Sequence, residues 1–128
     1  MVGGPPSGIE GAVERWYRRE ARRRLGSLAA AEALVLGVEP GSISIRDPRT
    51  RWGSCSSRGT LSFSWRLLLC PPQVADYVVV HELCHLRELN HSRAFWRLVE
   101  AARPGHREQA AWLREHGREV HAYRPGVR

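Results

Sequence analysis

The segment from Tyr77 to His91, YVVVHELCHLRELNH, constrains the fold more than any other part of the chain. It begins with an apolar run that predicts a buried helix start. On an α-helix, His81 and His85 lie about 40° apart in azimuth and about 6 Å apart along the axis, so both imidazoles can bind one ion. Glu82 is offset by about 100° from His81 and can reach a water at that ion without binding the metal. The pattern therefore predicts a metal-binding helix with Glu82 as general base.

A third metal ligand is expected, because a catalytic zinc ion usually takes three protein ligands and one water. His91 is predicted to be this ligand, although on a continuing helix it would lie about 240° around from His85 and face away from the metal. The helix is therefore expected to stop, with Asn90 as the left-handed residue that turns the chain back. Glu100 and Glu88 are the alternative ligands.

Changes in hydrophobic period divide the rest of the chain into helices and short strands. Helices are predicted from Pro72 onward and over 9–25, 28–38, 93–102 and 106–116, and strands over 43–45, 51–55 and 61–65. Gly26 and Gly117 are predicted to end helices, Gly59 to form a hairpin turn and Ser92 to cap a helix. The result is an α+β fold, in which a small three-stranded sheet packs against the metal-binding helix and further helices lie at both ends.

A length of 128 residues fits a single domain. This domain is predicted to span 9–117, between a mobile N-terminal segment at 1–8 and a C-terminal tail at 118–128. Since the chain shows neither a membrane-spanning apolar run nor a signal peptide, a cytoplasmic monomer without membrane contact is expected. Its three cysteines form no CxxC pair, which argues against a disulfide framework and a structural thiolate site.

The charge of the chain is strongly positive, with 20 basic residues against 13 acidic ones, a net charge of +7 and no lysine. Such a surface attracts polyanions. Arginines on the first predicted helix recur on one face and form a stripe that offers weak nucleic-acid binding: Arg15, Arg18, Arg19, Arg22 and Arg23. A solvated arginine face is the simpler interpretation. Glu20 lies within the apolar face of the same helix and needs a partner, for which Arg24 is predicted.

Two longer stretches, RWGSCSSRGTLSFSWRLLLCPP and DYVVVHELCHLRELNHSRAFW, resemble the YgjP-like, SprT-related zinc metallopeptidases. The resemblance covers roughly residues 14–113. It implies a minimal zincin-like fold and a zinc ion held by His81, His85 and His91, with Glu82 as general base. The function expected from the resemblance is hydrolysis of a peptide or protein substrate.

In zincins generally, a strand beside the active-site helix pairs with an extended peptide, so the resemblance makes either 51–55 or 61–65 the substrate-binding edge. Arg51 and Arg66 flank these segments. Each either stabilises an oxyanion or binds substrate, or it is a structural ion-pair partner or a solvated side chain. Cys84 is expected to be a packing residue. Two other functions are open: a metal-dependent hydrolase of nucleotide phosphoanhydrides, and a nucleic-acid-associated protease acting on DNA-bound proteins.

Overall fold

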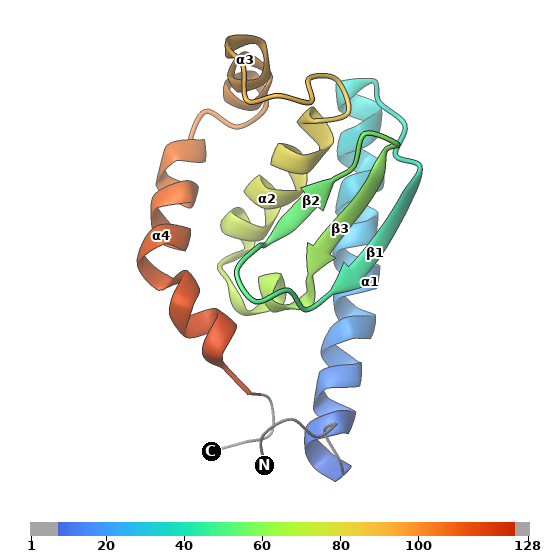
Figure 1. Cartoon of the computed structure of the whole chain (residues 1–128), viewed down its shortest axis with the longest axis vertical. Helices are drawn as coiled ribbons and strands as arrows, with labels where there is room; N and C mark the ends of the chain where they lie inside the picture. Colours follow the sequence, from blue (N-terminus) through green and yellow to red (C-terminus); the bar gives the residue numbers. More distant parts are fainter. Residues whose placement is uncertain (1–7, 125–128) are drawn as a thin grey trace.

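The structure is a computed structural model that describes residues 8–124. Its elements follow in the order α1 (Gly8–Leu36), β1 (Ser42–Arg46), β2 (Gly53–Cys55), β3 (Thr60–Ser64), η1 (Trp65–Leu69), α2 (Pro72–Cys84), α3 (Arg93–Ala102) and α4 (His106–Ala122). Helices α1 and α2 lie behind the sheet, α4 flanks α2 on the side away from α1, and α3 lies at one end (Figure 1). The predicted α+β fold is confirmed. Of the predicted mobile segment, residues 1–7 lie outside the described range, and Gly8 begins α1.

Helix α1 is one continuous helix of 29 residues, so the predicted break at Gly26 is wrong. A buried stripe with a spacing of four continues along one face past this position: Ala21, Leu25, Ala29 and Ala33. Its packing offsets the cost of about 0.5–1 kcal/mol that a glycine imposes inside a helix. The helix ends at Gly37, whose φ of +70° lets the Val38 N–H reach the Ala33 carbonyl at 3.0 Å. Within residues 8–124, no helix is long and apolar enough to cross a membrane.

Several charged residues of α1 pair with one another. Glu20 accepts a hydrogen bond from Arg23 at 2.8 Å and lies 3.3 Å from Arg24, its predicted partner. The hydrogen bond from Arg23 is the largest cause that lowers the pKa of Glu20. Arg18 pairs with Glu14 at 3.1 Å. Arg18 and Arg23 of the predicted stripe are therefore partly neutralised, which reduces the charge that the stripe offers to a polyanion.

The sheet is mixed and has the strand order β1-β3-β2. Central β3 pairs parallel with β1 and antiparallel with β2. The predicted hairpin between β2 and β3 is confirmed, and Gly59 in its turn has a φ of +86°. Leu61 and Phe63 of β3 are fully buried, and Ser62 between them points to the opposite face. The alternating sequence thus selects the face of the sheet that meets the helices.

Helix α2 begins at Pro72, as predicted from the tolerance of the first helical turn for proline. Nine of its 13 residues are buried, so it is a core helix with little free surface. A short 3-10 helix that was not predicted, η1, connects the sheet to α2. The Ser64 hydroxyl begins η1 by accepting a hydrogen bond from the Arg66 N–H at 3.1 Å.

Helices α3 and α4 complete the domain. Ser92 caps α3 as predicted, because its hydroxyl accepts from the Phe95 N–H at 3.3 Å. Helix α4 runs on to Ala122, so its predicted end before Gly117 is wrong. A Cβ atom at Gly117 would lie 3.2 Å from the Trp52 ring. The glycine therefore allows α4 to approach the segment before β2 closely, and it does not end the helix.

Arg66 joins three parts of the chain in the interior. Its guanidinium donates to Asp47 at 2.7 Å, to the Val120 carbonyl at 3.1 Å and to the Tyr123 carbonyl. The side chain is only 4% exposed and lies over the Trp65 ring. A positive charge at the last turn of α4 also offsets the unpaired carbonyls there. Of the two roles considered for Arg66, the structure supports the structural ion pair.

Replacing Arg66 by methionine leaves Asp47 and the terminal carbonyls of α4 without their donor. Breaking such a buried pair from one side costs about 3–5 kcal/mol, and because Asp47 is partly exposed we expect a loss of about 3 kcal/mol in the free energy of unfolding. Urea unfolding measures it. The exposed Arg22→Met variant is the control, with an expected change within about 0.5 kcal/mol. Equal small effects in both variants would contradict this role of Arg66.

Candidate metal centre

Three imidazoles meet at the end of α2 next to α3. Tyr77, His81 and His85 follow one another at a spacing of four along one side of the helix and its last turn. His91 reaches the same place from the following loop, and one ligand atom from each of His81, His85 and His91 lies within 4.8 Å of the other two. In the part of the chain that the structure describes, this is the one such group of three or more metal-ligand residues.

The chain leaves α2 earlier than predicted. The helix ends at Cys84, and the next residues tighten into bonds to the third preceding carbonyl, beginning with His85 N–H to Glu82 at 3.1 Å. All residues with positive φ between positions 8 and 124 are glycines, so the predicted left-handed conformation of Asn90 is wrong. A 3-10 turn stops the helix without a left-handed residue. The loop that follows carries His91 back to the helix.

Two aromatic residues of α3 hold the histidine rings in place. The His85 ring stacks on Phe95, with a centroid distance of 4.3 Å and an angle of 19°. The His91 ring stacks on Trp96 at 5.8 Å and is perpendicular to the Phe95 ring at a centroid distance of 5.0 Å. His85 and His91 approach each other to 3.1 Å between their Nε2 atoms. Helix α3 therefore forms the second half of the site.

Hydrogen bonds orient the two helical histidines. His85 Nδ1 lies 3.1 Å from the Glu88 carbonyl, which only accepts, so Nδ1 carries the proton and Nε2 keeps a free lone pair. The Tyr77 hydroxyl lies 3.4 Å from His81 Nδ1. Burial, with the neighbouring His85 and His91 adding to it, lowers the pKa of His81 to about 4. His81 is therefore neutral at pH 7, and a neutral imidazole is the form that binds an ion such as zinc.

Glu82, the residue after His81, lies against strand β2. Its side chain is buried, and a Cβ atom at Gly53 would lie 3.0 Å from its Cγ atom. Burial raises the pKa of Glu82 to about 7, and the charge of Arg51 opposes this rise. Glu82 is thus a carboxyl that can gain or lose a proton near neutral pH, and it lies between α2 and the edge strand β2.

The two alternative ligands make contacts of different kinds. Glu88 contacts His85 through its backbone carbonyl, and this contact does not involve its carboxylate. The Glu100 carboxylate lies 3.1 Å from His106 Nε2, and the His106 side chain is only 8% exposed. Neither carboxylate joins a metal-ligand group among the described residues. This arrangement favours His91 as the third ligand.

Several residues that shape the site were not predicted from the sequence. The position of Tyr77 beside His81 was predictable from spacing, because Tyr77 precedes His81 by four residues on the same face of the helix. Trp96 and Phe95 follow the third histidine closely, but their stacking depends on the angle at which α3 returns. The sequence around Gly53 does not predict its contact with Glu82, because the approach of β2 to α2 follows from the packing of distant segments. Cys84 is fully buried, as expected of a packing residue.

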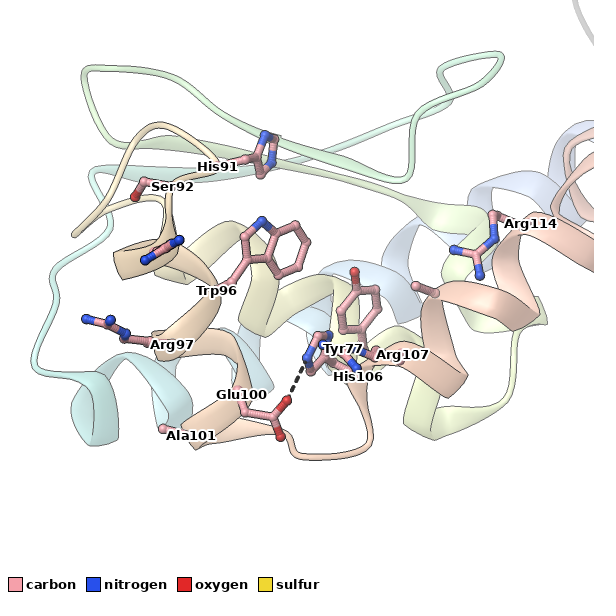
Figure 2. A pocket seen from close by; sticks show the side chains of 12 residues that line it. Tyr77, His91, Ser92, Trp96, Arg97, Glu100, Ala101, His106, Arg107 and Arg114 are labelled. Atoms are coloured by element: carbon pink, nitrogen blue, oxygen red, sulfur yellow. Dashed lines mark hydrogen bonds and ion pairs between the residues drawn. The ribbon is translucent and has the colours of Figure 1, made fainter.

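An open groove of about 940 Å³ adjoins the metal centre between α3 and α4. His91 lines one end of it, and Tyr77 and Trp96 project into it from either side (Figure 2). The pair of Glu100 and His106 forms part of its wall. The three histidines therefore lie next to an open space and not in a closed interior.

Residues 2–116 match the sequence model of the family described as YgjP-like, metallopeptidase domain. The chain belongs to this family. The crystal structure of the metallopeptidase zymogen of Pyrococcus abyssi abylysin is similar to this YgjP-like chain, with a TM-score of 0.64 and 26% sequence identity over 73% of this chain and 96% of that one. Comparison with curated proteins gives no match. The predicted family resemblance is thereby confirmed.

The raised pKa of Glu82 predicts how the stability of the metal-free protein depends on pH. Its folded pKa is about 7, above the ordinary value of 4.5. Between these values the unfolded chain has lost a proton that the folded chain retains, so the contribution of Glu82 to stability falls as pH rises. Glu82→Gln removes this loss. We expect the free energy of unfolding of Glu82→Gln, relative to that of the wild type, to rise across this pH window by on the order of 3 kcal/mol.

Urea unfolding in the presence of a chelator, repeated across the same pH window, measures this difference. The control is Glu108→Gln, which changes an exposed carboxyl on α4. The difference in free energy of unfolding between Glu108→Gln and the wild type should stay constant with pH. A constant difference for Glu82→Gln as well would show that burial does not raise the pKa of this carboxyl.

Proposed function

We propose that the protein is a zinc peptidase in which His81, His85 and His91 hold the metal and Glu82 is the general base. Membership of the family makes the chain a metallopeptidase. The proposal adds the identity of the metal, its ligands and the base. The observation that carries it is the convergence of three imidazoles beside a buried carboxyl of raised pKa.

Zinc held by three imidazoles supplies Lewis acidity, which polarises a substrate carbonyl and makes water at the site more acidic. The protein contributes the orientation of the ligands. The Glu88 carbonyl keeps the proton of His85 on Nδ1, so that Nε2 remains the ligand atom. Phe95 and Trp96 limit the rotation of the His85 and His91 rings. Such outer contacts keep a site ready for the metal.

Glu82 would take the proton from the attacking water and return it to the leaving amine. A pKa near the working pH is the most effective for both steps, since the group then accepts and donates with similar ease. Burial between α2 and β2 brings the pKa of Glu82 to about 7. The contact with Gly53 keeps the carboxyl close to the sheet.

Strand β2 is the segment best placed to bind an extended peptide. It is an edge strand, and its residue Gly53 contacts Glu82. Strand β3 already has a partner on both sides, so its backbone groups are occupied. An edge strand can pair with a substrate through main-chain hydrogen bonds. This arrangement supports 51–55 over 61–65 as the substrate-binding segment.

Glu82→Gln tests the proposed base. Zinc should remain bound at one ion per chain, measured by elemental analysis, because Glu82 is not a ligand. Hydrolysis of peptides from an unbiased library should fall by about 10²–10⁴-fold, the usual share of general acid–base catalysis. Unchanged hydrolysis in this variant would rule out Glu82 as the base.

His91→Ala and Glu100→Gln test which residue is the third ligand. Loss of an outer hydrogen bond lowers metal affinity by about 10–100-fold, and loss of a direct ligand should cost more. We expect His91→Ala to lower zinc affinity beyond that range and Glu100→Gln to leave it nearly unchanged, as measured by chelator competition. The reverse result would make Glu100 the ligand.

The same proteins separate the other two functions from the peptidase. Phosphate or pyrophosphate released from nucleotides by the wild type, and lost in Glu82→Gln, would favour a nucleotide hydrolase instead. A protease of DNA-bound proteins would bind DNA through Arg15, Arg19 and Arg22 of the stripe, and this binding would weaken steeply with added salt.

A further inference from the structure

The groove beside the metal centre is lined mainly by positive and apolar groups. Twelve residues line it, of which four are arginines and one is acidic. The arginines come from both walls, Arg93 and Arg97 from α3 and Arg107 and Arg114 from α4. The single carboxylate, Glu100, is already bonded to buried His106. The groove therefore offers an excess of positive charge to anything that enters it.

The four groove arginines differ from many other arginines of the chain. Among the described residues, five arginines form ion pairs: Arg18, Arg23, Arg24, Arg66 and Arg103. Arg103, for example, binds Asp76 at 2.9 Å and also contacts Glu32, which ties the end of α3 to α2 and α1. No groove arginine has an ion-pair or hydrogen-bond partner in the described part of the chain. Their guanidinium groups remain available to a ligand.

Arg114 is the groove arginine whose charge acts on Tyr77. It belongs to the face of α4 that also carries Ala110 and Gly117, and Ala110 lines the same groove. Burial raises the pKa of Tyr77, the charge of Glu82 adds to this rise, and the charge of Arg114 opposes it. Arg114 is thus near the tyrosine whose hydroxyl contacts His81. Figure 2 shows Arg114 and His91 towards opposite ends of the groove, with Tyr77 and Trp96 between them.

We propose that this groove binds the part of a peptide substrate next to the scissile bond and selects acidic side chains there, chiefly through Arg114. The proposal rests on the peptidase function proposed above and specifies its substrate class. The Trp96 and Tyr77 rings provide apolar surface for the peptide, while the arginines on the rim bind Asp or Glu carboxylates. Arginine suits this role, because its planar guanidinium can bind a carboxylate through two parallel hydrogen bonds.

Binding to full-length, zinc-loaded Glu82→Gln protein tests the proposal without turnover. The probes are a fluorescein-labelled peptide with Asp and Glu on both sides of its centre and a matched peptide with Asn and Gln at the same positions. We expect the acidic peptide to bind at least about tenfold more tightly in fluorescence anisotropy, the effect of one good charge-assisted hydrogen bond. This preference should shrink as salt is added.

Adding Arg114→Gln to this protein should remove most of the preference, and Arg114→Glu should reverse it. Arg22→Gln is the matched control, since it removes the same charge from an exposed site on α1 and should leave the preference intact. All these positions are exposed, so the unfolding midpoints should not change. Equal binding of both peptides, or an equal effect of Arg22→Gln and Arg114→Gln, would overturn the proposal.

Cleavage of the same peptides by the zinc-loaded wild type separates this proposal from the peptidase function. Cleavage without preference for the acidic peptide would overturn the groove assignment and leave the peptidase intact. Tight acidic binding that depends on Arg114, with no peptide cleaved, would support the groove and contradict the peptidase. A single-stranded oligonucleotide that bound more tightly than the acidic peptide, and weakened in Arg114→Gln, would overturn the proposal in favour of nucleic acid.

Discussion

The burial of α2 between the sheet, α1 and α4 is the constraint on which the candidate site depends. Val79, Val80 and Leu83 are fully buried, and each such side chain contributes about 1.5–3 kcal/mol. Their packing sets the rotation of the helix about its axis. His81 is thereby turned towards α3, and Glu82 is turned towards β2. The proposed metal ligand and the proposed base therefore lie on different sides of one helix, whose orientation is set by its buried apolar residues.

The sequence predicted the parts of the site that depend on local spacing. His81 and His85, the Ser92 cap and the hairpin at Gly59 were all found from residues close together in the chain. The errors came from packing between distant segments. Gly26 lies inside a helix because a buried stripe continues past it, and α4 passes Gly117 because Trp52 lies against it. One error was local instead: the return of His91 was predicted, but the chain leaves the helix through a 3-10 turn after Cys84 and not through a left-handed Asn90.

Arginine has two uses in this chain, which has no lysine. Arg66 and Arg103 are partly or wholly buried and bind carboxylates and carbonyls from several elements, so they hold the helices together. The groove arginines have no such partners among the described residues and lie around aromatic surface next to the histidines. The guanidinium groups of Arg66 and Arg103 stabilise the fold. Those of the groove arginines are available for substrate, which connects the strongly basic composition to the proposed peptidase function.

The proposed peptidase activity depends on three imidazoles that share one metal ion. X-ray absorption spectroscopy at the zinc edge, on protein loaded with one zinc per chain, tests this most directly. We expect three imidazole nitrogens at about 2.0–2.1 Å from the zinc ion and one further light atom in its first shell. A first shell with a sulfur atom, or with two imidazoles and a protein carboxylate, would contradict it.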